Sequence, residues 1–157
     1  MDAFDQASQL PQNIPANFSA SEADNLEDVT VQHMETYWNI LEKVKGSSLR
    51  LTKLDDEIYT HLTIDFPEFD PAEPIDEDKM KSKAGKERWR KFLMAYEKRV
   101  DDYNFGTMLR TDPKLEYTQH ETIFVPRMQF YAVEIARNRK GLNDWIYEKA
   151  QAEKASK

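Results

Sequence analysis

Apolar residues recur at helical spacing in several separate stretches of this chain, with polar residues between them. The first stripe begins after Asp24, which has Glu27 three residues on, as in a capping box. Its members lie three or four residues apart: Leu26, Val29, His33, Tyr37, Ile40, Leu41 and Val44. We expect Gly46 to stop this helix in a left-handed conformation.

Two further helices are predicted in the middle of the chain. The second begins near residues 52–55 and ends before Pro67. Residues 67–78 contain three prolines among carboxylates, so we expect an extended loop there. The third helix has the clearest apolar stripe, which we expect to lie in the core: Trp89, Phe92, Leu93, Tyr96, Val100 and Tyr103.

The segment 117–125 is open to two interpretations. It could end in a short strand that pairs with residues 107–110, or it could begin a helix with Pro126 in the first turn, and we favour the helix. A fourth helix then runs up to Gly141. Asn143 is placed to cap a last amphipathic helix.

These patterns predict a mainly α protein, a compact bundle of about five helices. One short β-hairpin between the third and fourth helices is an alternative that the patterns also allow. Residues 1–22 are rich in Gln, Asn, Ser, Ala and Pro, and we expect a flexible N-terminal extension. A single helical domain should cover 23–150, followed by a flexible C-terminal tail at 151–157.

Charge is distributed unevenly along the chain. Residues 1–78 carry 4 basic and 18 acidic side chains, whereas residues 79–157 carry 18 basic and 11 acidic ones. Such asymmetry can steer a charged partner, although exposed charges commonly form solvated faces. The absence of cysteine, of a basic N-terminal start and of a membrane-length apolar run favours a cytoplasmic location and no membrane partner.

Motifs for catalysis and cofactor binding are missing from the sequence. The four glycines belong to no phosphate-binding loop, and His33, His61 and His120 are isolated. We therefore expect no enzyme, no cofactor and no metal. An RNA- or ribosome-binding accessory protein that uses the basic half is an alternative, but a pI near 5.0 opposes phosphate binding over much of the surface, and DNA is not expected as a partner.

The loop after the third helix is the first candidate recognition element. It reads YNFGTMLRTD, and its polar or special positions are Asn104, Gly106, Arg110 and Asp112. Gly106 could instead serve a positive φ or a close approach, and Arg110 and Asp112 could pair with each other or cap a turn. If Arg110 is exposed, Arg110→Ala should cost under about 1 kcal/mol of stability.

A second candidate surface is the basic side of the chain, represented by Arg88, Arg90, Arg137 and Asn138. These residues carry charge or amide groups on the predicted third and fourth helices. They would bind the partner if the loop after the third helix only holds the fold together.

Three blocks, at 49–59, 86–112 and 127–149, resemble the eukaryotic family called "polysaccharide biosynthesis domain-containing". The resemblance runs from about Ala23 to Lys149 and includes NFGTMLRTD and QFYAVEIARN. It implies a small helical cytosolic protein that acts as an ATP-independent, dedicated chaperone. Its client would be the newly made GTPase domain of translation elongation factor one-alpha, engaged at the ribosome with the nascent polypeptide-associated complex.

The family label suggests an enzyme, because it is shared with plant xylan methyltransferase relatives. This chain lacks the Gly-rich loop that holds a methyl-donor nucleotide. A methyltransferase-like enzyme of polysaccharide biosynthesis is therefore the least favoured reading.

Overall fold

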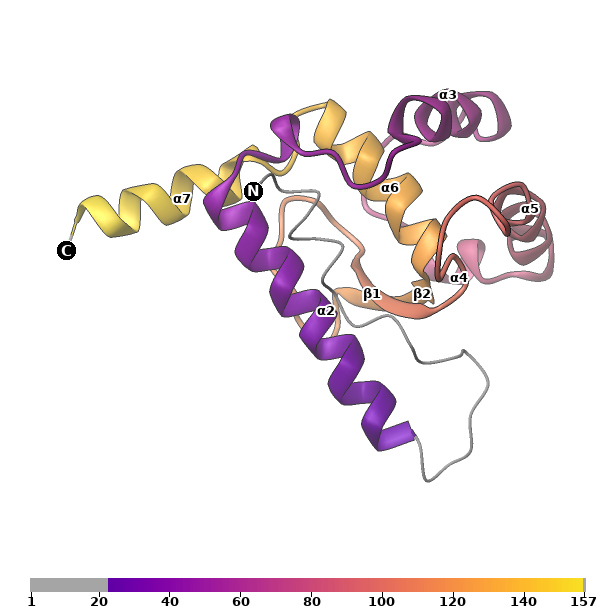
Figure 1. Ribbon diagram of the computed structural model, residues 1–157, viewed down its shortest axis with the longest axis horizontal. Helices are drawn as coiled ribbons and strands as arrows, with labels where there is room; N and C mark the ends of the chain where they lie inside the picture. The colour runs from indigo at the N-terminus through magenta and orange to yellow at the C-terminus, as the bar shows by residue number, and fades with distance from the viewer. Residues whose placement is uncertain (1–22, 157) are drawn as a thin grey trace.

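The computed structural model describes the chain from residue 23 to residue 156, with side chains described from residue 29 onward. The predicted N-terminal extension, 1–22, and the side chains of Asp24 and Glu27 lie outside these residues. The described part contains six α-helices, one short 3-10 helix and a two-stranded antiparallel sheet (Figure 1). The mainly α prediction is confirmed.

Helix α6, Arg127–Arg139, lies at the centre of the fold, because nearly all of its side chains are buried. Helix α2, Ala23–Lys43, packs on strand β1 and on α7, Asp144–Ala155. Helices α3, Asp55–Asp65, and α5, Lys83–Met94, contact α6. The arrangement is looser than the predicted bundle, since α7 extends away from the other helices (Figure 1).

The hairpin consists of β1, Gly106–Arg110, and β2, Thr122–Pro126. Leu109 pairs with Ile123, and both side chains are buried. The strand alternative for this segment is therefore confirmed, and the favoured helix start was wrong. Alternating burial along β2 explains the outcome, because only a strand sends successive side chains to opposite faces.

The end of β2 leads directly into α6, with Pro126 as the N-cap residue. The Arg127 amide donates to the Phe105 carbonyl at 2.6 Å, and the Met128 amide donates to the Tyr103 carbonyl at 2.7 Å. These bonds attach the first turn of α6 to the chain that enters β1. They satisfy amides that a helix start otherwise leaves without partners.

The predicted core stripe of the third helix is largely confirmed, because Trp89, Phe92, Leu93 and Tyr96 are buried. Regular α-helix ends at Met94, earlier than the stripe suggests, and the chain continues in turns. The Ala95 and Tyr96 amides donate to carbonyls three residues back, which keeps the apolar side chains on the same side. Trp89 stacks on Phe66 from the end of α3, with ring centroids 4.3 Å apart.

A short helix that the sequence analysis missed, α4, spans Glu77–Met80 at the end of the proline-rich loop. The Asp76 side chain caps it by accepting the Lys79 amide proton at 3.1 Å. With α4 counted, the hairpin follows the fourth helix, so its predicted place between the third and fourth helices was wrong. The sequence pattern predicts an extended loop over residues 67–78. Acidic residues such as those before Lys79 also favour a helix start.

Gly46 does not terminate α2 in a left-handed conformation, because α2 ends at Lys43 and positive φ among the described glycines occurs only at Gly141. Gly46 instead begins the 3-10 helix η2, Gly46–Ser48, and is buried. A Cβ there would lie 2.4 Å from the Asn138 Oδ1 atom. Close approach to α6 therefore explains this glycine.

The C-terminal helix α7 continues through Ala155, beyond the predicted domain end at residue 150. Asn143 occupies its N-cap position, but the side chain does not cap the helix. Among the helices of residues 23–156, we find none with the length and apolar character needed to cross a membrane.

Candidate functional site

A buried network of charges lies between α6 and the end of β1. Glu134 extends from the middle of α6, and Arg137 lies one turn further along the same helix. The Glu134 carboxylate contacts the Arg110 guanidinium at 3.3 Å and the Arg137 guanidinium at 3.1 Å. All three side chains are almost fully enclosed, because other elements surround α6.

Backbone carbonyls and aromatic rings surround the Arg110 guanidinium on its other sides. Its NH1 group donates to the Pro113 carbonyl at 3.1 Å and to the Leu115 carbonyl at 2.9 Å. The rings of Trp38 and Tyr117 have their centroids 5.6 and 5.7 Å from the guanidinium carbon. Arg110 thus fixes the loop between the two strands against α2.

Two asparagines extend the network toward the molecular surface. Asn143 accepts from Arg110 at 2.5 Å and donates to the Asn138 side-chain oxygen at 2.7 Å. Asn138 in turn donates to the Tyr37 hydroxyl at 3.3 Å. The network therefore connects the hairpin, α6, α2 and the start of α7.

The pKa shifts in the network show which charges persist. Burial alone would raise the pKa of Glu134, but Arg110 and Arg137 outweigh it and hold this pKa below its ordinary value. Burial lowers the pKa of Arg137, against the opposing effect of Glu134, yet arginine stays protonated at neutral pH. Burial also raises the pKa of Tyr37, so its hydroxyl remains neutral. The buried unit is an ion triad with two positive charges and one negative charge.

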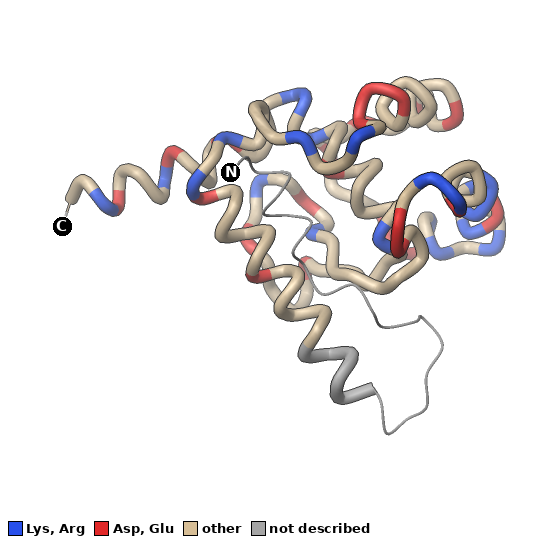
Figure 2. The backbone as a smooth tube through the Cα atoms, viewed as in Figure 1, with Lys and Arg blue, Asp and Glu red and all other residues tan. Residues whose placement is uncertain are grey.

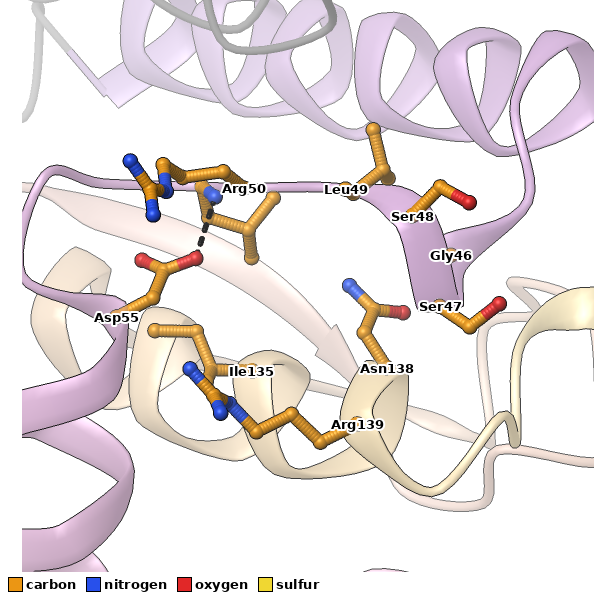
Figure 3. Close-up of a pocket in the computed structure, with 10 residues that line it drawn as sticks. Gly46, Ser47, Ser48, Leu49, Arg50, Asp55, Ile135, Asn138 and Arg139 are labelled. Carbon is orange, nitrogen blue, oxygen red and sulfur yellow. Dashed lines mark hydrogen bonds between the residues drawn. The ribbon is translucent and has the colours of Figure 1, made fainter.

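A surface pocket of about 440 Å³ lies directly outside this network, between η2, the extended residues 49–51 and the last turns of α6 (Figure 3). Ile135 and Asn138 of α6 form one side of it. Arg50 and Arg139 line it with guanidinium groups, and Ser47 and Ser48 line it with hydroxyls. Its size is that of a small-ligand pocket.

Several polar groups around this pocket are already occupied. The Ser47 amide and hydroxyl donate to the Asp144 carboxylate at 2.9 and 2.7 Å. Arg139 forms an ion pair with Asp56, whose pKa is lowered chiefly by that hydrogen bond. Arg50 forms no ion pair among the described residues.

Metal binding has no obvious centre in the part of the chain that the structure describes. No group of three or more His, Asp or Glu side chains is placed to hold a metal ion there. The His33 Nδ1 atom lies 2.6 Å from the Thr107 hydroxyl oxygen, but both groups are buried away from the pocket lining.

The structure separates the predicted exit-loop residues into different environments. Asn104 is exposed and Asp112 is half-buried, with its carboxylate accepting the Lys114 amide proton at 2.9 Å. Gly106 has no positive φ, and a Cβ on it would lie 2.0 Å from the Phe124 ring, so close approach is the reason for glycine. Arg110 is 1% exposed and pairs with Glu134 rather than with Asp112. The condition under which Arg110→Ala would cost little, an exposed Arg110, is therefore not met.

The predicted basic side is also divided. Arg137 and Asn138 are buried, so their expected exposure was wrong, although Asn138 lines the pocket. Arg88 and Arg90 are exposed. Arg88 pairs with Glu68 at 2.5 Å, and Arg90 pairs with Glu87 at 2.8 Å. A role in partner binding stays a prediction for all the named residues.

Sequence analysis missed the residues that complete the network, above all Glu134 and the side-chain role of Asn143. Glu134 and Arg137 stand three apart on one helix, which indicates a local ion pair. Nothing in the sequence places Arg110 on the opposite side of the same carboxylate, because that contact joins residues from a strand and a helix.

Comparison with known proteins identifies a family. The model of the family described as "PBDC1 protein" matches residues 26–148. A curated relative named "Protein PBDC1 homolog" from Saccharomyces cerevisiae is 54% identical over 83% of this chain and 97% of its own length. The human "Protein PBDC1" is 41% identical over 81% of this chain and 54% of its own length.

A solved structure agrees with the fold. A solution NMR structure of a Saccharomyces cerevisiae protein superposes with a TM-score of 0.73 at 54% sequence identity. The match covers 83% of this chain and 97% of the other chain. The fold of this chain is thus similar to one determined by experiment.

Proposed function

The chain belongs to the PBDC1 family, and we propose that it is a dedicated, ATP-independent chaperone for the newly synthesised GTPase domain of translation elongation factor one-alpha. It acts in the cytoplasm, co-translationally, together with the nascent polypeptide-associated complex at the ribosome. It works by binding its client and not as an enzyme.

Family membership is the observation that carries this proposal. Three blocks carry the resemblance: 49–59, 86–112 and 127–149. They lie within the range that the family model matches, residues 26–148, except for the last residue of the third block. In space these blocks supply Arg110, Glu134 and Arg137 of the buried triad and most of the pocket lining. The residues that carry the resemblance therefore form one connected part of the fold.

The architecture is compatible with binding a single client. The buried triad fixes the hairpin, α6 and α7 relative to one another, so the surface they present is rigid. Polar and charged groups dominate the exposed side chains of α5 and of the pocket. Matched polar groups give a binder specificity, whereas a flexible apolar groove favours promiscuity.

The test is capture of a defined nascent chain. The full-length protein is tagged and added to a translating lysate programmed with the elongation factor GTPase domain or, as a control, with an unrelated small GTPase. We expect enrichment of the elongation factor domain alone, and no change after nuclease treatment. Equal capture of both GTPases, or of neither, would contradict the proposal.

A nuclease-sensitive signal would favour the RNA- or ribosome-binding alternative. The exposed lysines of α5 support this alternative. Nucleic-acid binding of that kind should weaken steeply as salt rises, irrespective of sequence.

A further inference from the structure

Helix α5 presents a surface opposite its core side that no other element of residues 23–156 covers. Trp89, Phe92 and Leu93 face the interior. The exposed residues at helical spacing on the other side form what we call the α5 outer face: Lys83, Lys86, Glu87, Arg90, Lys91 and Met94. Figure 2 shows basic residues along this helix. Four cations and one carboxylate give this face a net positive charge.

The cations of the α5 outer face form no ion pair with another element of the described chain, a property that they share with exposed lysines elsewhere, such as Lys53, Lys114 and Lys154. Arg88, Arg99 and Arg139 each pair with a carboxylate from a different element. Within the described residues, Lys83, Lys86 and Lys91 form no ion pair, and Arg90 pairs only with Glu87 of its own helix. The fold itself therefore does not use these lysines.

The positions of Lys83 and Lys86 also oppose helix stability. Lys83 is the first residue of α5, Lys86 follows in the same turn, and this turn contains no acidic residue. Cations there are disfavoured by the positive end of the helix dipole. Sequences commonly break such local rules at functional sites.

Gly85 lets the end of α4 approach the start of α5 closely. A Cβ on Gly85 would lie 2.4 Å from the Lys79 carbonyl oxygen and 2.5 Å from the Met80 carbonyl oxygen. Glycine thus lets the end of α4, with Lys79 and Lys81, lie directly against the first turn of α5. Helix α4 also carries Glu77, which pairs with Lys81 at 3.2 Å, and Asp78, so the net positive charge is confined to α5.

An exposed methionine distinguishes between partners for this face. Met94 lies at the C-terminal end of α5, four residues after Arg90, and is 56% exposed. A phosphate backbone offers no apolar surface to such a side chain. A protein segment with several carboxylates and an apolar residue can pair with the cations and also cover Met94.

We propose that the α5 outer face is the docking surface for an acidic segment of the client, with an apolar client residue packed on Met94. This inference rests on the proposed function, because it assigns the surface to the same client. The lysines steer the segment and set its register, and the methionine provides the desolvated contact.

The experiment compares two charge-reversal variants of the full chain. The first carries Lys83→Glu, Lys86→Glu and Lys91→Glu. The control carries Lys53→Glu, Lys114→Glu and Lys154→Glu, three exposed lysines elsewhere that form no ion pair among the described residues. Affinity for the freshly synthesised GTPase domain and melting temperature are measured for both. Both triple variants have the same net charge.

We expect the first variant to bind the client about tenfold more weakly, or worse, and the control to bind like the unmodified chain. The melting temperature of the first variant should change little, because Lys83→Glu and Lys86→Glu suit the first turn of a helix whereas Lys91→Glu opposes the helix dipole in the last turn. Weaker binding then cannot be attributed to unfolding. Raised salt should weaken binding of the unmodified chain more than that of the first variant.

A photo-crosslinker at position 94 tests the apolar contact, with position 64 on α3 as the matched site, because Ile64 is 70% exposed. We expect crosslinks to an acidic client peptide from position 94 and not from position 64. Equal client affinity of the unmodified chain and the first variant would overturn this inference and leave the proposed function standing.

If the unmodified chain does not bind the GTPase domain, the proposed function itself fails. If the chain binds a labelled single-stranded RNA through the same lysines, the assignment of the face to a protein segment is overturned.

Discussion

The Arg110 guanidinium and the Glu134 carboxylate form an ion pair at 3.3 Å with both side chains enclosed by protein. They come from β1 and from the middle of α6, so the pair joins the hairpin to the central helix. Arg137 contacts the other carboxylate oxygen at 3.1 Å. The three charges act as one structural unit. Removing Glu134 would leave two buried guanidinium groups without a counter-charge, and removing either arginine would leave buried hydrogen-bond acceptors without a donor.

Arg110→Ala should therefore lower the free energy of unfolding by about 3–5 kcal/mol, in contrast to the small cost expected for an exposed arginine. It leaves the Pro113 and Leu115 carbonyls without their donor and removes one of the two cations beside Glu134. Chemical denaturation measures the loss. The control is Arg90→Ala, on the exposed side of α5, which should cost under about 1 kcal/mol. Similar values for both variants would contradict the buried network.

Trp89→Ala should cost about 3–5 kcal/mol, as large-to-small changes in cores do. Trp89 is 6% exposed, stacks on Phe66 and contacts Phe92 edge-on at 5.5 Å between centroids. The comparison is Met94→Ala on the same helix, where the side chain is mostly exposed and the loss should be small. An unchanged denaturation midpoint for Trp89→Ala would mean that α3 and α5 do not pack as observed.

Two glycine substitutions should differ in cost although both create close contacts. Gly46→Ala places its Cβ 2.4 Å from the Asn138 oxygen, which is buried and hydrogen-bonded to Asn143. Gly106→Ala meets only the far end of the Phe124 ring, which is 43% exposed and can rotate outward. We expect a loss of about 2 kcal/mol or more for Gly46→Ala and about 1 kcal/mol or less for Gly106→Ala. Thermal denaturation of the two variants checks this order.

Sequence patterns predicted the apolar part of the fold well for a physical reason. Residues such as Phe92 and Tyr96 recur with the helical period because one side of the helix is buried, and that period is visible in the sequence. The hairpin was harder to predict, since a five-residue strand contains few alternations. Its strand register depends on pairing with β1, which a local pattern does not show.

The buried charges could not be predicted, because ordinary reasoning assigns charged residues to the surface. Glu134, Arg137 and Asn138 lie on the polar side of an amphipathic pattern, which predicts exposure. In the fold, other elements enclose α6 on nearly all sides, so its polar side chains are buried as well. Their burial depends on long-range contacts with Arg110 and Asn143.

His33 is fully buried on α2, and its Nδ1 atom lies 2.6 Å from the Thr107 hydroxyl oxygen. Burial, assisted by the positive charge of Arg127, lowers the pKa of His33 from 6.5 to about 3. The folded state thus keeps the imidazole neutral, whereas the unfolded chain protonates it below pH 6.5. Because the unfolded state binds the extra proton, stability should fall as the pH drops below 6.5 and stay level above it.

The expected slope for this one group approaches about 1.4 kcal/mol per pH unit between pH 6 and pH 5. This window lies above the range in which most carboxylates titrate. Urea denaturation at several pH values gives the slope for the unmodified chain and for His33→Gln, which should be less stable but should lose this slope. His120→Gln, at an exposed histidine, is the matched control and should keep it. If His33→Gln retained the full slope, another buried group would have to take up the proton on unfolding, and the neutral, enclosed state of His33 would be contradicted.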